Sequence, residues 1–316
     1  DRFSCFKEFE SFLEQKGPWI CGMDFPFGQP VKFIESLALP PTWPDYVKHL
    51  SKLEKKAFEK KVNNYKCLQP TGAKEPLRIT DTLADAQSPL KMVNAPLAKM
   101  FYEGAPRLLK SGVSIIPCLP KDDNRIVIET YPALISRRFA ESYKNNGNKD
   151  SSQKLSARQS IIAGLNLQLL NNDFGFDINL SKNIADMAVE DASGDVLDAI
   201  LCAIQAAWSY KQGKSYGIPD NQHPIIKSEG WIIDPSMLSA KPLKEPSIHH
   251  SDNWLISNPK IKNLMGQIKR LSDIGRSLSG EFNLEALLEM IVDEARTFTN
   301  ADGGTLYILD GNTLCF

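Results

Sequence analysis

Three short apolar runs, each followed closely by a proline, constrain the fold of this chain more than any other feature. They are "WICGMDFP" from Trp19, "GVSIIP" from Gly112 and "RIVIETYP" from Arg125. Apolar and β-branched residues favour strands, and proline ends a strand because it has no backbone N–H. Side chains alternate along a strand, so in the third run Ile126 and Ile128 share one face, and Val127 and Glu129 share the other.

Helical patterns surround these three strands. Residues 3–16 repeat apolar side chains at spacings of three and four, and residues 194–212 carry a long apolar stretch. Further helices are predicted over 94–110 and within "ALISRRFAESYK" and "SARQSIIAGLNLQLL". Residues 45–66, rich in Lys and Glu, predict a solvent-exposed helix, Arg78–Pro89 a polar loop, and "EGWIIDP" a short strand.

Composition places the 316 residues among soluble globular proteins, with 42% hydrophobic and 24% charged residues. A net charge of -1 gives no overall basic field for nucleic acid, although a local patch remains compatible with it. The chain contains no apolar run long enough for a membrane span and no signal peptide, which predicts a cytoplasmic protein without membrane contact. The six cysteines form no CxxC pair and predict reduced thiols, and the His249-His250 pair does not predict a metal site.

Proline, serine and lysine accumulate over residues 235–260, which is typical of a linker. Two helical patterns then precede the strands "GGTLYILD" and "NTLCF", joined at Asp310-Gly311. We therefore predict a first domain over 1–235, a linker over 236–258 and the start of a second domain over 259–316.

Four acids occupy apolar elements of the first domain. Asp24 ends the first strand, Glu129 lies on the third, and Asp195 and Asp198 share a face at the start of the long helix. Burying such charges together is costly unless a cation lies among them. Mg²⁺ and Mn²⁺ prefer carboxylate oxygens and water, and two such ions can activate water for phosphodiester cleavage.

A simpler interpretation assigns each acid a separate structural role. Asp195 and Asp198 favour the dipole at a helix N-terminus, and Asp24 caps a turn. Glu129 then pairs with a nearby arginine, Arg137 or Arg138.

The ordered motifs "GMDFPFGQP", "RITD", "IETYPAL", Tyr143-Lys144, Arg158, "GDVLDAILCA" and "EGWI" resemble the predicted RNase H-like nuclease family known as domain of unknown function 429. This resemblance covers residues 1 to about 235. It implies a ribonuclease H-like α/β fold, a mixed sheet flanked by helices. It also implies a two-metal site for Mg²⁺ or Mn²⁺, with ligands Asp24, Glu129, Asp195 and Asp198.

The resemblance also bears on substrate contacts. Arg78, Lys144 and Arg158 become candidates for contacts with a nucleic-acid phosphate, and surface ion pairs are the alternative. Trp231 could stack on a base, but a core position is the preferred interpretation.

One part of the family pattern does not occur in this sequence. Domains of this fold open with a strand that bears an Asp and with a hairpin, whereas this sequence starts at the helix that follows them. Two explanations stay open: the chain is a fragment, which a first residue Asp1 favours, or this copy has lost a metal ligand and its catalysis.

The stretch "LSDIGRSLSGEFNLEALLEMIVDEARTFTNADGGTLYILDGNTL" resembles the opening of a GAF domain. GAF domains are α+β sensors that bind small molecules, and the helix over 258–278 could serve a homodimer or pack as an ordinary helix. The sequence thus predicts a divalent-metal-dependent nuclease fused to a GAF sensor. The alternative is a catalytically degenerate RNase H-like scaffold in a GAF-containing signalling protein with a downstream output domain. A third possibility is a nucleotide-phosphate binder of the actin or hexokinase type. The glycine-rich phosphate loops that would favour it are missing from this sequence.

Overall fold

The structure is a computed structural model, and it describes residues 5–140, 142–145, 151–219, 225–238, 308–310 and 313–315. The chain divides into two compact units, Asp1–Leu243 and Lys244–Phe316. Each unit is described by itself.

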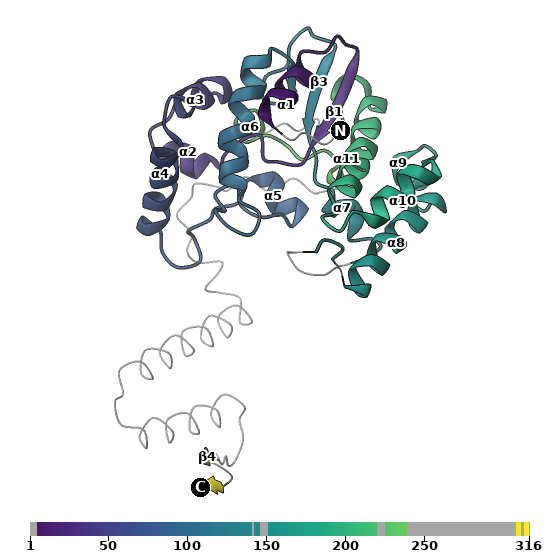
Figure 1. The fold of residues 1–316 in the computed structure, drawn as a ribbon. Helices are drawn as coiled ribbons and strands as arrows, with labels where there is room; N and C mark the ends of the chain where they lie inside the picture. Colours follow the sequence, from purple (N-terminus) through teal and green to yellow (C-terminus); the bar gives the residue numbers. More distant parts are fainter. Residues whose placement is uncertain are drawn as a thin grey trace, which may run out of the picture. The chain divides into compact units, whose positions relative to one another are not determined.

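The first unit is a mixed α/β fold around a small parallel sheet (Figure 1). Its strands are β1 (Trp19–Met23), β2 (Ser114–Ile116) and β3 (Arg125–Glu129), in the order β1-β3-β2. The register pairs Trp19 with Arg125 and Met23 with Glu129. All three predicted strands are confirmed. The strand predicted in "EGWIIDP" is reduced to an isolated bridge between Ile232 and Glu129.

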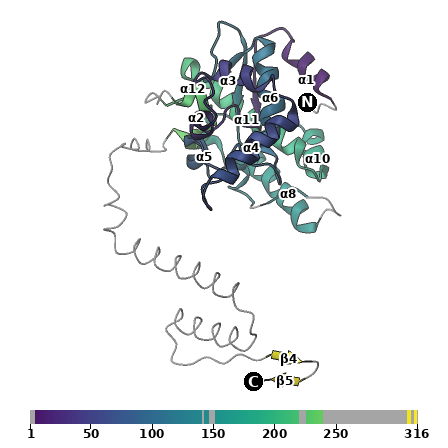
Figure 2. The same ribbon diagram turned by 90° about the vertical axis from the view of Figure 1, so that its left-hand side faces the viewer.

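Helices cover both faces of this sheet, and the alternation predicted for β3 decides which core each residue joins. Ile20, Ile126 and Ile128 belong to the core beneath α7 (Ala133–Ser136), α8 (Ser152–Asn166), α9 (Asn171–Phe174), α10 (Lys182–Glu190) and α11 (Asp195–Lys211). Trp19 and Val127 belong to the opposite core. That core lies beneath α1 (Phe6–Leu13), α2 (Val31–Ser36), α3 (Trp43–Leu50), α4 (Lys55–Leu68) and α6 (Leu97–Ser111) (Figures 1 and 2). The predicted helices over 3–16, 94–110 and 194–212 thus appear as α1, α6 and α11.

The segment 45–66 differs from its prediction. It contains parts of two helices, α3 and α4, and both pack against α6. Val47, Leu50 and Phe58 are fully buried, so the predicted solvent-exposed helix was wrong. Its Lys and Glu residues occupy the outer faces, while the apolar residues between them form the stripe that binds the core.

The segment Arg78–Pro89 is not the predicted polar loop. It contains helix α5 (Ile79–Ala84), whose capping residue Arg78 and third residue Asp81 are both buried. The backbone N–H of Arg78 donates to the Asp81 carboxylate at 2.9 Å. Helix α5 packs Ile79, Leu83 and Ala84 against the core, but with only six residues it is too short for hydrophobic periodicity to reveal it.

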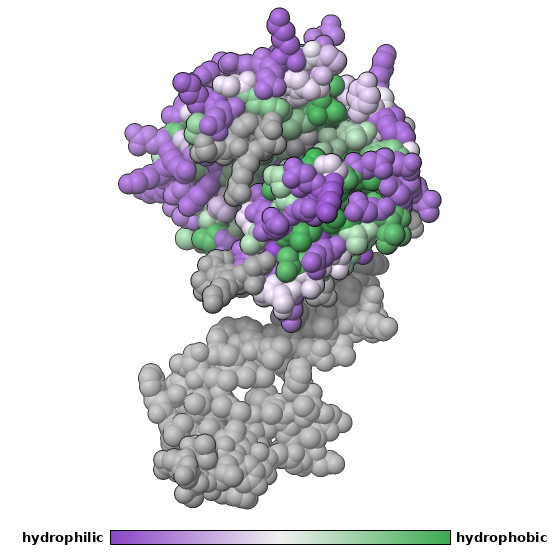
Figure 3. Space-filling view, turned by 45° about the vertical axis from the view of Figure 1, so that its right-hand side comes forward, coloured by the Kyte–Doolittle hydropathy of each residue, from purple (hydrophilic) through white to green (hydrophobic). Residues whose placement is uncertain are grey.

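The remaining elements of the unit are short. The helix predicted in "ALISRRFAESYK" is reduced to the single turn α7, and a further turn, α12, spans Ile226–Glu229. Two 3₁₀ turns span Gly213–Ser215 and Pro235–Met237. The side that carries α8, α9 and α10 shows apolar surface among hydrophilic residues (Figure 3). Leu167, Leu169, Ile184 and Met187 are its large exposed apolar side chains.

Of the second unit, the structure describes one antiparallel pair, β4 (Ile308–Asp310) and β5 (Thr313–Cys315). This pair lies in the two predicted strands on either side of Gly311. Most of the predicted linker over 236–258, the His249-His250 pair and the helix over 258–278 lie outside the described residues. Over the part of the chain that is described, no helix is both long and apolar enough to cross a membrane. Cys5, Cys21, Cys67, Cys118 and Cys202 are free thiols, as predicted.

Candidate functional site

Asp24 follows the last residue of β1, and the next two residues, Phe25 and Pro26, end the strand. The last ladder bond of β1 runs from the Thr130 N–H to the Met23 carbonyl at 3.0 Å. By the alternation of the strand, Asp24 lies on the same face as Gly22. A Cβ atom on Gly22 would lie 2.6 Å from the Cys202 carbonyl of α11, so this face of β1 directly contacts α11.

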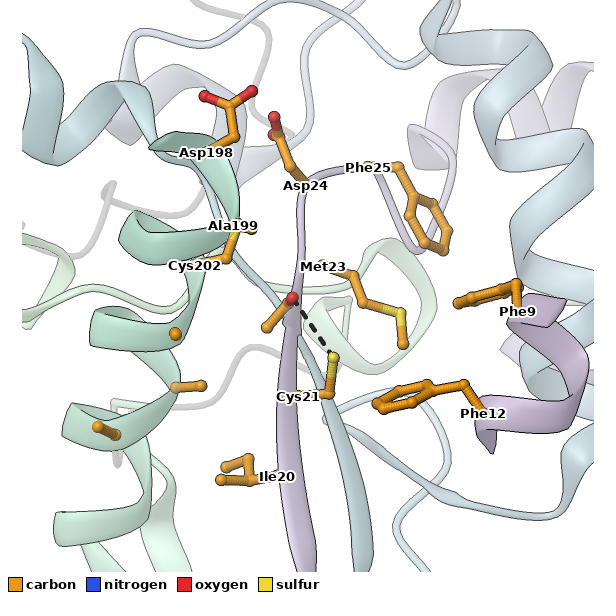
Figure 4. Close-up of a pocket in the computed structure, with 14 residues that line it drawn as sticks. Phe9, Phe12, Ile20, Cys21, Met23, Asp24, Phe25, Asp198, Ala199 and Cys202 are labelled. Atoms are coloured by element: carbon orange, nitrogen blue, oxygen red, sulfur yellow. Dashed lines mark hydrogen bonds between the residues drawn. The ribbon is translucent and has the colours of Figure 1, made fainter. Parts of the chain in front are cut away.

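Helix α11 brings Asp198 to the same place (Figure 4). Asp198 lies in the first turn of α11, and its side chain is 13% exposed. The Tyr143 hydroxyl donates to one oxygen of this carboxylate, and the Lys144 amine pairs with the other. The site therefore combines two acids, from β1 and α11, with a lysine and a tyrosine from the segment after α7.

The electrostatics of the two acids reflect their shared environment. Burial, followed by repulsion from Asp198, raises the pKa of Asp24 from 3.8 to about 7, although Lys144 opposes the shift. Burial also raises the pKa of Asp198, against the opposing effects of Lys144 and Tyr143. Burial alone would lower the pKa of Lys144, but the Asp198 carboxylate raises it overall, so the amine stays charged. Asp24 therefore takes up a proton near neutral pH unless a cation replaces it.

A cavity of about 570 Å³ opens beside the acids. It runs along β1 between α1, which contributes Phe9 and Phe12, and α11, which contributes Ala199, Cys202, Ala203, Ala206 and Ala207 (Figure 4). Its size is that of a small-molecule site. Asp24 and Asp198 lie at one end of a largely apolar groove.

Glu129 does not join this pair. The register pairs it with Met23, so it projects to the face of the sheet opposite Asp24. There its carboxylate accepts two bonds from the Arg78 guanidinium, at 2.6 Å and 2.9 Å. Burial raises the pKa of Glu129, and the Arg78 charge opposes that shift.

This buried cluster organises the backbone that follows Asp24. Glu129 also accepts the Phe27 N–H at 2.9 Å, and Arg78 pairs with Asp81 at 2.6 Å. Glu229 accepts the Val31 N–H at 2.7 Å, at the start of α2, and the Ile79 N–H at 3.1 Å, at the start of α5. We refer to Arg78, Asp81, Glu129 and Glu229 as the buried arginine cluster.

Of the three basic residues predicted to contact a phosphate, two lie in the interior. Arg78 is 2% exposed within the buried arginine cluster, and Arg158 is 0% exposed. Arg158 donates to the Val189 carbonyl at 2.7 Å and to the Tyr143 carbonyl at 3.0 Å. Arg158 thereby supports the segment that carries Tyr143 and Lys144. Of the three predicted basic residues, Lys144 reaches the candidate site, where it pairs with Asp198.

Asp195 is the first residue of α11 and is exposed to solvent, one turn from Asp198. Its charge acts on both Lys144 and Asp198. Within the described residues no group of three or more His, Cys, Asp or Glu side chains is arranged to hold a metal ion. The geometry thus places two acids, Asp24 and Asp198, at the groove, and the exposed Asp195 lies one helical turn from Asp198.

Two features of the site were not assigned from the sequence. Tyr143 belongs to a sequence motif, and its position directly before Lys144 is the available signal for its role. The aromatic wall from Phe9 and Phe12 was predicted only as a helix stripe. Trp231 is 5% exposed and belongs to the core, which confirms the preferred interpretation.

Comparison with known proteins adds one result. Residues 1–223 match a family described as "Protein of unknown function (DUF429)". Neither the curated proteins nor the solved structures contain a significant match.

Proposed function

Because this chain belongs to the family described as protein of unknown function (DUF429), which carries no assigned activity, we propose a function from the site itself. We propose that the first unit is a ribonuclease H-like domain that hydrolyses phosphodiester bonds of nucleic acid with a divalent cation. The observation that carries the proposal is the pairing of Asp24 with Asp198 at the end of an open groove.

The donor set fits Mg²⁺ or Mn²⁺. These cations take oxygen ligands, and Mg²⁺ commonly binds through one or two carboxylates together with water and substrate phosphate. Asp24 and Asp198 would hold the ion, because both lie at the groove and each is repelled by the other. When bound, the ion would supply charge for the phosphate and lower the pKa of a water molecule.

The other residues of the site have positioning roles in this proposal. Lys144 and Tyr143 fix the Asp198 carboxylate, which still has lone pairs for a ligand. The Lys144 side chain is 41% exposed, so its amine can also contact a phosphate oxygen. Glu129 contributes to the raised pKa of Asp24 by repulsion, and it anchors the Phe27 backbone three residues further along.

The test is cleavage of labelled single-stranded, duplex and hybrid nucleic acids in Mn²⁺ or Mg²⁺. We expect Asp24→Asn and Asp198→Asn to lose activity by at least about a hundredfold, because each removes a predicted ion ligand. Asp186→Asn, an exposed acid on α10, is the matched control and should leave the rate unchanged. Calorimetric titration with Mg²⁺ or Mn²⁺ alone should show binding that the two site variants lose. Full activity in both site variants would refute the proposal.

A second function is favoured by the position of Glu129. With that acid tied to Arg78, the first unit can act as a non-catalytic scaffold, and residues 259–316 would begin a GAF sensor that binds a small molecule and supports a homodimer. Absence of both cleavage and cation binding in the intact chain would favour this scaffold.

A further inference from the structure

Arg158, on α8, is a fully buried cation that binds backbone carbonyls in two directions. Its side chain is 0% exposed. Nε donates to the Val189 carbonyl at 2.7 Å, and a terminal nitrogen, Nη1, donates to the Tyr143 carbonyl at 3.0 Å. Val189 lies in the last turn of α10, where the backbone carbonyls lack partners within the helix. Arg158 therefore joins the end of α10 to the segment that follows α7.

The burial of this charge has a cost that packing alone does not require. A charged group loses its hydration when it is buried, and an apolar side chain of similar length would fill the same space without that loss. A guanidinium supplies a planar set of donors in fixed directions, which a flexible amine lacks. Its charge also favours the negative end of the α10 dipole. Oriented bonds to two carbonyls are thus what arginine provides at position 158.

The segment that Arg158 holds carries the two side chains that contact Asp198. Residues 142–145 have no regular secondary structure, yet Tyr143 is only 7% exposed. The Tyr143 hydroxyl and the Lys144 amine contact the two oxygens of the Asp198 carboxylate. Because no helix or sheet bonds fix this segment, its side chains keep their positions only if other contacts fix its backbone.

The connection between α10 and α11 supplies further anchors for the segment. The Asn145 N–H donates to the Ala192 carbonyl at 2.9 Å. Gly194, directly before α11, has a φ of +77°, and a Cβ atom there would lie 2.9 Å from Cγ of Lys144. Helix α10 also packs against both α8 and α11 (Figure 1). The segment is therefore held between α8 and the start of α11, and its position depends on both.

From these contacts we propose that Arg158 is a positioning residue of the candidate site. Its guanidinium fixes the Tyr143 backbone, and the side chains of this segment thereby hold the Asp198 carboxylate beside Asp24. Because Arg158 is fully buried, it acts on the site through the Tyr143 backbone rather than by contact with a phosphate. The effect on cation binding rests on the proposed function, whereas the effect on the segment does not.

The first experiment measures amide hydrogen exchange in the 316-residue chain. Arg158→Met keeps an unbranched side chain but removes both donors. We expect exchange at Asn145 to become at least about tenfold faster relative to Val127, a buried strand residue that reports global opening. Ile161→Ala, a fully buried apolar position on α8, is the matched control and should not raise this ratio. An unchanged ratio in Arg158→Met would overturn the proposal.

The second experiment is a double-mutant cycle on Mn²⁺ binding, measured by calorimetry. Arg158→Met should weaken binding by about 10- to 100-fold, as expected for a residue that orients ligands. Tyr143→Phe, which removes the hydroxyl that contacts Asp198, should also weaken it. If Arg158 acts through this segment, the double variant should lose several-fold less than the product of the two single losses. Ile161→Ala combined with Tyr143→Phe should give the full product. Independent effects of Arg158→Met and Tyr143→Phe would contradict the positioning role.

The two experiments separate this proposal from the proposed function. If the wild type neither binds Mn²⁺ nor cleaves nucleic acid, the proposed function fails, and the exchange ratio still decides whether Arg158 fixes the segment. If the wild type binds Mn²⁺ and Arg158→Met binds it equally well, the positioning role fails and the proposed function stands.

Discussion

Two groups of acids lie on opposite faces of one small sheet, and their environments differ sharply. In the buried arginine cluster, Arg78 is 2% exposed and bridges Asp81 to Glu129. At the groove, the partly exposed Lys144 pairs with Asp198 and lowers the pKa of Asp24. A rigid guanidinium that is fully enclosed fixes backbone, whereas a flexible amine at a cavity mouth leaves carboxylate oxygens available to a ligand. The difference separates a structural cluster from a candidate site.

The largest expected effect tests the structural cluster. Arg78→Met leaves Glu129 and Asp81 buried without their cation, and we expect it to lower the free energy of unfolding by about 3–5 kcal/mol. Urea denaturation measures this loss. Arg107→Met, in a half-buried pair with Glu10 and Glu103, is the control and should cost under about 1 kcal/mol. Equal losses for the two variants would mean that the buried arginine cluster stabilises the fold no more than a half-buried ion pair does.

The second effect concerns the stability of the protein without metal as a function of pH. The pKa of Asp24 is raised to about 7, so the folded state binds more protons than the unfolded state between about pH 4 and 7. Stability from this group is therefore present below pH 4 and is lost as the pH rises to 7.

Asp24→Asn should remove that loss. The variant should gain roughly 2–4 kcal/mol relative to the wild type between pH 4 and pH 7, as measured by urea denaturation at each pH. Asp186→Asn should show no such trend. A pH-independent difference between Asp24→Asn and wild type would mean that Asp24 is not buried beside another charge.

The third effect probes how Lys144 serves the two acids. Because Lys144 lowers the pKa values of Asp24 and Asp198, Lys144→Met should move the Asp24 titration to higher pH. Under the proposed function it should also reduce cleavage by about 10- to 100-fold, as expected for a residue that positions a ligand. Lys60→Met, on the exposed face of α4, should change neither the titration nor the rate. An unchanged Asp24 titration in Lys144→Met would mean that Lys144 does not interact with the acids of the site.

The smallest effect is expected at Asp195, the exposed acid at the start of α11. Asp195 is exposed in the first turn of α11, where an acid favours the helix dipole, so Asp195→Asn should cost under about 1 kcal/mol of stability. Cation affinity, measured by calorimetry, should change less than in Asp24→Asn. A loss of affinity as large as that of Asp24→Asn would make Asp195 a direct ligand.

The elements that the sequence predicts well are those with regular patterns. The strands around Ile20, Ile115 and Val127 and the helices α6 and α11 follow from periodicity and from proline or glycine at their ends. Helix α5 was missed because it has only six residues, and its capping contacts between Arg78 and Asp81 leave no periodic signal. The candidate site was half predicted: Asp24 and Asp198 meet, and Glu129 lies elsewhere.

By itself, the sequence determined three strands, the faces of β3 and the positions of the acids along the elements, because those properties depend on local periodicity. Only the tertiary structure decided the partners. Arg78 and Glu129 are 51 residues apart, and Tyr143 and Asp198 are 55 apart, so no local pattern encodes either contact. The register of β1 with β3 sends Glu129 to the Arg78 face and leaves Asp24 facing α11. That register separates a buried ion pair from an open groove with two acids.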